Sequence, residues 1–145
     1  MELLCRSFDE LSREELYELL RLRCAVFVVE QNCPYQDLDG LDSAALHLFL
    51  RDEKGIQACL RLLPPGLAGA DARIGRVLAV RRHCGLASRL LEAGIRLCRE
   101  RFGPVPILVE AQTYARSLYE KQGFRQTSEE FLEDGIPHIQ MRLMP

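Results

Sequence analysis

The sequence predicts a single domain, residues 1–145, of the α/β (α+β) class, with a mixed central sheet of six to seven strands flanked by helices. Three observations support this class. First, an extended run, a helix and a second extended run lie between Arg73 and Val109, which favours a right-handed crossover between parallel strands. Second, residues Gly85 to Arg101 form a long amphipathic pattern. Third, Asp134-Gly135 is a strong two-residue hairpin turn.

The N-terminal elements follow from local signals. Leu3 to Phe8 predicts a first strand. Ser12 and Glu15 form a capping box, so a helix begins there, and its apolar face extends to about Val29. Residues Asn32 to Asp42 are rich in Pro, Gly and Asp and predict a loop.

The middle of the chain predicts three strands and the longest helix. Ala45–Arg51 and Ile56–Leu63 are joined by a turn at residues 52–55. Arg73–Val80 is a third extended run. The helix Gly85–Arg101 follows, because its polar residues recur at helical spacing and the remainder is apolar.

The C-terminal third predicts a short strand, a helix and a hairpin. Ile107–Val109 is the strand. The helix has one face made by Ala115, Leu118, Tyr119 and Gln122. Gly123 ends that helix, and strands Phe124–Glu133 and Ile136–Leu143 form the hairpin. The predicted order is therefore β-α-β-β-β-α-β-α-β-β.

Composition excludes several classes of partner. Apolar residues make up 48% of the chain, charged residues 28%, and the net charge is −2, so we expect neither nucleic acid nor a membrane as a partner. No apolar run reaches the roughly 18 residues that a membrane span needs. Residues 1–10 have no signal-peptide core, so we expect a cytoplasmic protein. The six cysteines match no zinc spacing, which predicts reduced thiols and no metal site.

A ligand-binding pattern lies between the third predicted strand and the long helix. It comprises Arg82, His83, Cys84, Gly85, Leu86 and Ala87. The first N–H groups of a helix have no partner inside it, and the small residues Gly85 and Ala87 let a ligand approach them. With Arg82 as a permanent cation, the segment predicts a pyrophosphate site, the alternative being an ordinary strand-to-helix turn. It fits neither the Rossmann fingerprint nor an NTP-binding loop.

Arg82-x-x-Gly85-x-Ala87 resembles the (Q/R)-x-x-G-x-(G/A) pyrophosphate loop of the GNAT superfamily of acetyl-CoA-dependent N-acyltransferases. Ala115 to Phe124 resembles the second signature of that superfamily, A-x-x-L-Y-x-x-x-G-F. Arg23 to Tyr35, Gly75 to Val77 and Glu133 to Ile139 are similar to segments of its ElaA-like branch. The resemblance runs from about Phe8 to Met141 and implies the GNAT fold.

The resemblance also implies an activity: transfer of an acetyl group from acetyl-CoA to a primary amine of a small molecule or peptide. The strand before the loop splays from its neighbour in such enzymes, so Val77, Leu78, Ala79 and Val80 are expected along the pantetheine arm. Tyr119 matches the tyrosine that protonates the departing thiolate. The chain departs from the family pattern in the length of the connection between this strand and the loop. Either Val77 ends the strand, or the connection from the strand to Arg82 is unusually short.

Three residues are candidates for the general base: Glu30, Glu110 and His138. The acidic residues Asp37, Asp39 and Asp42 predict either a polar turn or an acidic rim that attracts a cationic amine. The alternatives to an acetyltransferase are a non-catalytic acyl-CoA-binding module, an acyl transferase similar to acyl-homoserine-lactone synthases, and a redox or metal protein. Exposed edge strands in such a sheet also favour a homodimer.

Overall fold

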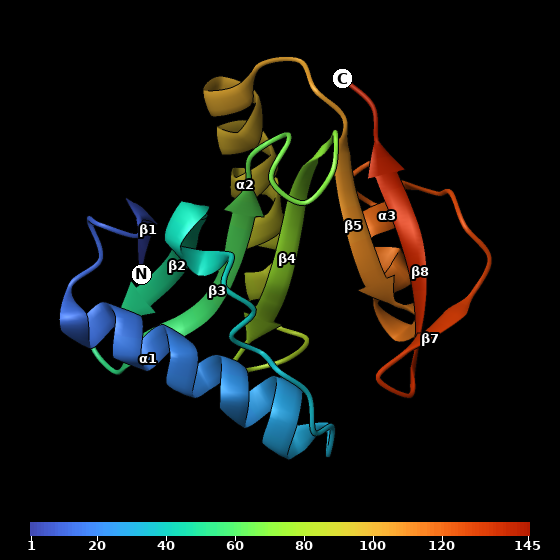
Figure 1. Cartoon of the computed structure of the whole chain (residues 1–145). Coiled ribbons are helices and arrows are strands. Elements are labelled where there is room, and N and C mark those ends of the chain that lie inside the picture. Colours follow the sequence, from blue (N-terminus) through green and yellow to red (C-terminus); the bar gives the residue numbers. More distant parts are fainter.

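A computed structural model describes residues 1–145 as one mixed sheet with helices on both faces (Figure 1). The strands are β1 (Glu2–Ser7), β2 (Leu46–Asp52), β3 (Gly55–Leu63), β4 (Ala72–Ala79), β5 (Ile107–Gln112), β6 (Arg125–Gln126), β7 (Phe131–Glu133) and β8 (Ile136–Leu143). The helices are α1 (Arg13–Arg23), α2 (Leu86–Phe102) and α3 (Arg116–Glu120), with a π-helix η1 (Cys24–Glu30) and 3₁₀ turns η2 (Asp42–Ala44) and η3 (Thr113–Ala115). The strand order is β1-β2-β3-β4-β5-β8-β6, and β7 also pairs with β8.

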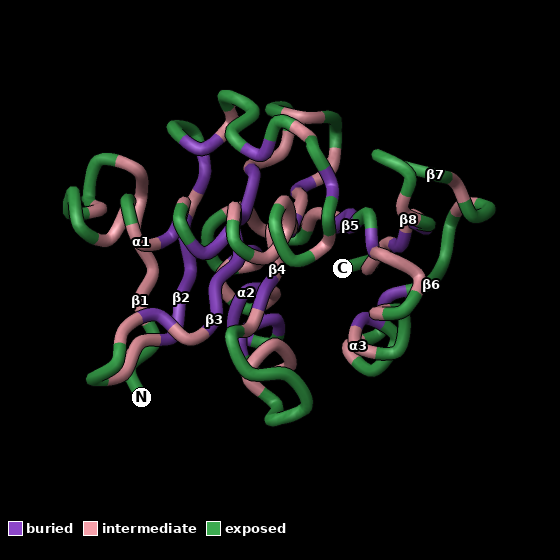
Figure 2. Tube along the Cα trace, turned by 90° about the horizontal axis from the view of Figure 1, so that it is seen from below, coloured by how far each residue is buried: buried purple, intermediate pink, exposed green.

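The core forms two layers, one on each face of the sheet. On one face, Leu19 and Leu22 of α1 pack against a cluster that includes Phe49 and Leu78. On the other face, α2 and α3 cover the larger cluster of 18 buried residues. Burial concentrates along β2, β3 and β5, whereas many of the loops at the periphery are exposed (Figure 2). The predicted α/β class with a helix-covered mixed sheet is therefore confirmed.

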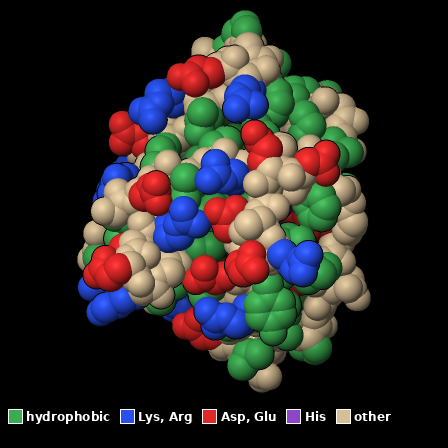
Figure 3. Space-filling model, turned by 90° about the vertical axis from the view of Figure 1, so that its left-hand side faces the viewer, with side chains coloured by type: hydrophobic (Ala, Val, Ile, Leu, Met, Phe, Trp, Pro, Cys, Tyr) green, Lys and Arg blue, Asp and Glu red, His purple; other side chains and the backbone are tan.

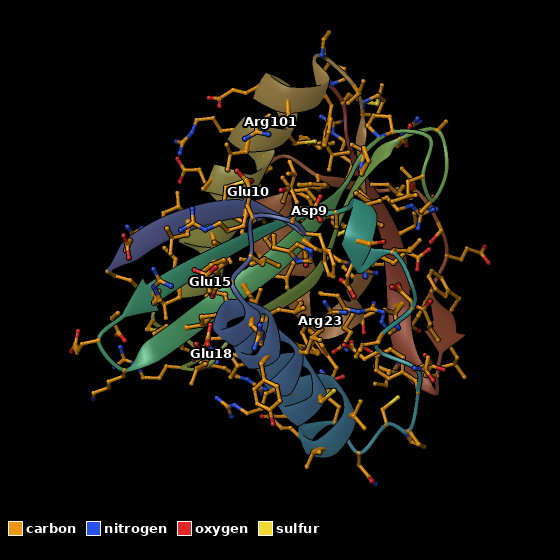
Figure 4. All side chains as sticks on the ribbon, turned by 60° about the vertical axis from the view of Figure 1, so that its left-hand side comes forward. Asp9, Glu10, Glu15, Glu18, Arg23 and Arg101 are labelled. Carbon is orange, nitrogen blue, oxygen red and sulfur yellow. The ribbon has the colours of Figure 1, made fainter.

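The first helix begins at the predicted cap. Ser12 Oγ accepts a hydrogen bond from the Glu15 N–H at 3.0 Å, and Glu15 Oε1 accepts one from the Ser12 N–H at 2.9 Å. Glu18, one turn further along α1, accepts a hydrogen bond from the Ile56 N–H at 2.9 Å and so ties the helix to the start of β3 (Figure 4). The helical segment extends to Glu30, one residue past the predicted end near Val29, but its last seven residues wind as the π-helix η1.

The C-terminal hairpin differs from the expectation of one strand over Phe124–Glu133. That segment forms two short strands, β6 and β7, which raises the sheet to eight strands instead of six or seven. The interruption coincides with a side-chain contact across the hairpin. Ser128 Oγ accepts the Gln140 N–H at 2.9 Å, so a side chain takes the place of a main-chain partner in the ladder. The predicted Asp134-Gly135 turn is present, with φ of 52° and 79°.

The sheet opens between β4 and β5. These parallel strands follow the predicted crossover through α2, but they pair only at Ala72 with Ile107 and at Arg73 with Leu108. In Figure 1 they start side by side and diverge along their length. β4 keeps its other neighbour, β3, as far as Ala79. One edge of β4 therefore lacks a strand partner beyond Arg73.

A β-bulge lies in β4 where the strands diverge. Cys59 pairs with Leu78 and Arg61 with Gly75, so two residues of β4, Arg76 and Val77, face a single residue of β3. Arg76 has φ of 51°, a left-handed conformation that costs energy in a residue with a side chain. A bulge bends its strand and increases the twist, which turns β4 away from β5.

The surface mixes charges of both signs. On the face shown in Figure 3, Lys and Arg side chains alternate with Asp and Glu side chains, consistent with the net charge of −2. No helix combines the length and the apolar character required to cross a membrane.

Candidate active site

A cleft of about 380 Å³ occupies the space between the diverging strands. One wall is residues 74–77 of β4, and the opposite wall includes Leu108, Glu110, Ala111 and Gln112 of β5. Tyr114, Ala115 and Tyr119 line it from the segment that follows β5. The β7–β8 hairpin and the loop after η1 complete it. The cleft is therefore a direct consequence of the opened sheet.

The free edge of β4 presents main-chain groups to the open side of the sheet. The Val80 N–H donates to the Gln57 carbonyl at 2.8 Å, so Val80 faces β3. Main-chain groups alternate in direction along an antiparallel strand, which turns Leu78 toward β3 as well. Ala79 and Val77 then direct their N–H and C=O groups toward the open side. Of the four residues expected along the pantetheine arm, two thus offer hydrogen-bonding groups and two are held by β3.

The N-terminus of α2 lies just beyond β4. The connection runs only from Val80 to Gly85, because β4 continues past Val77 to Ala79. Gly85 has φ of 80° and no side chain caps the helix. The backbone N–H groups of Leu86, Ala87 and Ser88 make no hydrogen bond in the structure. Free N–H groups at the positive end of a helix dipole are suited to an anion.

The remaining residues of this connection are exposed. Arg82 donates to Glu30 Oε1 at 2.6 Å, and both side chains are about half exposed. Such a surface ion pair contributes at most about 1 kcal/mol, so a phosphate group can replace the carboxylate. His83 has φ of 59°, and Cys84 Sγ donates to the Arg81 carbonyl at 3.1 Å. The pairing places Glu30 at the α2 end, outside the lining of the cleft.

Tyr119 reaches the cleft from α3 through an apolar wall. The residue is 7% exposed, and its ring packs edge-on against Phe124 at a centroid distance of 5.7 Å. Its hydroxyl has no hydrogen-bond partner and is not sealed from solvent. Burial raises the pKa of Tyr119 above its ordinary value, so it stays protonated at neutral pH. It is therefore available as a hydrogen donor in the cleft.

Glu110 and His138, the other two candidates for the base, both line the cleft, and Glu133 lies with them. They come from β5, β8 and β7 respectively. His138 Nε2 is 3.7 Å from Glu133 Oε2, and Arg73 Nη1 is 3.5 Å from Glu110 Oε1. Burial, and then the neighbouring Glu110 carboxylate, raise the pKa of Glu133. Glu133 was not among the residues predicted for the site, although it lies in the segment Glu133 to Ile139 that is similar to the ElaA-like branch.

The loop that closes the cleft over β4 is held by a buried ion network. Arg23 of α1 binds Asp37 at 2.9 Å and Asp42 at 2.7 Å, and it points from the helix toward the loop (Figure 4). Arg61 binds Asp39 at 2.6 Å and Asp42 at 3.1 Å.

Arg76, at the bulge of β4, extends the network into the cleft wall. It binds Asp37 at 2.9 Å and Asp39 at 3.3 Å and lies over the ring of Tyr35. These aspartates are therefore neutralised by arginines, and the interpretation as an acidic rim is wrong. The loop instead connects α1 to the bulge.

The network predicts that acid destabilises the fold. Hydrogen bonding from Arg61 holds the pKa of Asp39 well below its usual range. Burial acts to raise the pKa of Asp42, but hydrogen bonds and charge from Arg23 and Arg61 outweigh it and lower that pKa. A carboxyl with a depressed pKa stabilises the fold above its unfolded pKa of about 3.9, and this contribution is lost as the pH falls further. We therefore expect the melting temperature to fall steeply below pH 4. A constant melting temperature down to pH 3 would contradict the network.

The cysteines do not form a reactive cluster. All six are free thiols. Burial raises the pKa of Cys59 to about 12 and that of Cys98 to about 11, which keeps both protonated and unreactive. No group of three or more His, Cys, Asp or Glu residues is placed to hold a metal ion.

Comparisons with known proteins agree with this geometry. A model of the acetyltransferase (GNAT) domain matches residues 75–145. The chain is 37% identical to a UPF0039 protein of Schizosaccharomyces pombe over 147 residues, which cover 99% of this chain and 97% of the relative. The structure of an acyl-CoA N-acyltransferase from Pseudomonas aeruginosa superposes with a TM-score of 0.92 at 38% identity, covering 98% of this chain and 99% of that one.

Escherichia coli ElaA gives a TM-score of 0.89 at 36% identity, with coverage of 98% of this chain and 99% of that chain. The relative from Schizosaccharomyces pombe and both structures match nearly the whole chain. Fold, site geometry and sequence identity lead to one assignment: the chain belongs to the GNAT acetyltransferase superfamily, in the branch of the ElaA and UPF0039 proteins.

Proposed function

We propose that the protein is an acetyl-CoA-dependent N-acyltransferase that acetylates a primary amine of a small molecule or peptide. The observation that carries the proposal is the unpaired edge of β4 beyond Arg73, which opens onto a cleft and leads to the free amides of α2. Extended polar ligands bind such edges as an added strand would. A pantetheine arm has amide groups along its length, and these can form hydrogen bonds with the free main-chain groups of Val77 and Ala79.

Successive parts of the site along β4 correspond to successive parts of acetyl-CoA. The N–H groups of Leu86, Ala87 and Ser88 would hold the diphosphate, and Arg82 would exchange Glu30 for a phosphate oxygen. The thioester would then lie by the bulge, in the part of the cleft that Tyr119 lines. The amine attacks the thioester carbonyl carbon, the C–S bond breaks, and the departing thiolate takes a proton.

Tyr119 is assigned the role of the acid that protonates the thiolate. We expect Tyr119→Phe to lower kcat about 100-fold, the low end for general acid catalysis, because a thiolate leaves readily without help. Affinity for acetyl-CoA should change little, since the phenyl ring keeps its contact with Phe124. Steady-state kinetics and calorimetric titration with acetyl-CoA measure the two effects. An unchanged kcat would mean that Tyr119 takes no part in the reaction and only lines the cleft.

The experiment that tests the function combines binding and turnover on the wild-type protein. Calorimetry measures acetyl-CoA binding, and chromatography measures CoA and acetylated amine across a panel of primary amines. Chromatography is preferable to a thiol reagent because Cys84 is exposed and would react. Release of CoA with matching acetyl-amine supports the proposal. Binding without turnover supports an acyl-CoA-binding module, and a preference for long acyl chains supports an enzyme similar to acyl-homoserine-lactone synthases.

A further inference from the structure

Three polar side chains converge in the cleft from three different strands. Glu110 lies on β5, Glu133 on β7 and His138 on β8. The strand register brings them together, because His138 pairs with Gln112 of β5 on one side and with Phe131 of β7 on the other. The Phe131 ring stacks on the imidazole at a centroid distance of 6.0 Å and fixes its plane.

The hydrogen bond of His138 determines which ring nitrogen is free. Nδ1 lies 2.7 Å from the Ile136 carbonyl oxygen, and a carbonyl only accepts, so Nδ1 carries the hydrogen. In the neutral ring, Nε2 then has an unshared electron pair. The residue is 8% exposed, yet Nε2 has no hydrogen-bond partner and is not sealed from solvent. A buried imidazole thus directs an unused acceptor into the cleft.

The negative charge of Glu133, beside this imidazole, is not matched by an arginine. Of the carboxylates that line the cleft, Asp39 is bound by Arg61 and Arg76. Glu110 has one long contact, with Arg73 at 3.5 Å, and no guanidinium reaches Glu133. Glu133 therefore faces a second carboxylate with only His138 to offset the charge. A cation bound there would relieve the repulsion.

We propose that this part of the cleft receives the acceptor as a cationic alkyl amine: Glu133 and Glu110 bind the ammonium group, and His138 Nε2 removes its proton. The inference rests on the proposed acyltransferase function and deepens it, because it names the class of acceptor and selects the base. Amines with a carboxylate close to the amino group are disfavoured, since that carboxylate would lie against Glu133 and Glu110.

The proton and bond changes balance with these groups. One N–H proton of the ammonium passes to His138 Nε2, which forms an imidazolium stabilised by Glu133 at 3.7 Å. The freed nitrogen pair forms the C–N bond as the C–S bond breaks. The nitrogen loses its second proton, the thiolate gains one, and His138 returns its proton to solvent. The net products are the amide, CoA and one released proton.

The acceptor class is tested with Glu133→Gln, which keeps the shape and removes the charge. The control is Glu130→Gln, the same change at an exposed residue that does not line the cleft. Loss of one charge-assisted hydrogen bond is expected to raise the KM for 1-propylamine about tenfold and to leave the KM for acetyl-CoA unchanged. The wild type should have a higher kcat/KM with 1-propylamine than with β-alanine, and the ratio of the two values should be smaller in Glu133→Gln. Equal use of both amines by the wild type would overturn the proposal.

The base is tested with His138→Asn, whose side-chain amide keeps a donor for the Ile136 carbonyl but has nothing at the position of Nε2. Its kcat with 1-propylamine should fall about 100-fold, within the range for general base catalysis. With a fluorinated amine that is already neutral at the assay pH, the kcat of the variant should fall much less, because that amine needs no deprotonation before attack. Equal losses with both amines would show that His138 acts only in structure.

A binding measurement separates this inference from the proposed function. Titration of 1-propylamine into the wild-type protein saturated with CoA should give binding that Glu133→Gln weakens about tenfold and Glu130→Gln leaves unchanged. Failure of acetyl-CoA itself to bind would instead refute the proposed function. Amine binding that is equal in the wild type and Glu133→Gln, with acetyl-CoA still bound, refutes the inference alone.

Discussion

The Ala87→Glu variant is expected to lose acetyl-CoA binding by about 100-fold or more and still fold normally, because the proposed diphosphate would form several charge-assisted hydrogen bonds at this site. Ala87 lies in the first turn of α2, where the N–H groups of residues 86–88 have no partner. A carboxylate there is favourable for the helix, by about 0.3–1 kcal/mol, since it lies at the positive end of the dipole. The same carboxylate would repel a diphosphate and occupy its donors. Stability and binding should therefore change in opposite directions.

A second glutamate variant controls for the added negative charge. Tyr17 is 74% exposed on α1, away from the cleft, so Tyr17→Glu changes the net charge equally. We expect the control to bind acetyl-CoA as the wild type does. Calorimetric titration and thermal melts of both variants provide the comparison. Full acetyl-CoA affinity in Ala87→Glu would exclude the α2 N-terminus as the diphosphate site.

The Arg23→Met variant is expected to lose about 3–5 kcal/mol of unfolding free energy, the cost of leaving buried carboxylates without a partner. Arg23 is 2% exposed and holds Asp37 and Asp42 together. Methionine retains much of the side-chain volume, so the effect isolates the charge. At this chain length the loss corresponds to a fall of about 10 °C or more in melting temperature.

The exposed pair Arg116–Glu120 offers a matched control. Its closest atoms are 4.0 Å apart, and both side chains are about half exposed. Arg116→Met should therefore change the unfolding free energy by less than about 1 kcal/mol. Chemical denaturation of the two variants measures the difference. Equal stability of Arg23→Met and the wild type would mean that the network contributes nothing to the fold.

Local sequence signals were sufficient for most elements of the fold. The Ser12–Glu15 box, the amphipathic α2 and the Asp134-Gly135 turn each depend on neighbours in the sequence, and each is present as predicted. The break between β6 and β7 was not predictable, because it depends on Ser128 reaching Gln140 across the hairpin. The π-helical turn η1 was missed because apolar periodicity does not distinguish it from an α-helix.

The site could be predicted only in part, since long-range contacts determine most of it. The proposed phosphate loop and Tyr119 lie in contiguous motifs, which the resemblance to the GNAT superfamily identified. The network around Arg23 joins residues up to 39 positions apart, such as Asp37 and Arg76, and nothing in the sequence marks their pairing. Glu133 was missed for a related reason: only the strand register places it beside His138 and Glu110.

A crystal structure of the protein with acetyl-CoA would locate the coenzyme directly. We expect the diphosphate on the amides of residues 86–88, the pantetheine arm along Val77 and Ala79, and the thioester beside Tyr119. The opposite result would be a coenzyme bound elsewhere, with the gap between β4 and β5 still open and those amides hydrogen-bonded within the protein. That result would contradict the proposed position of the coenzyme.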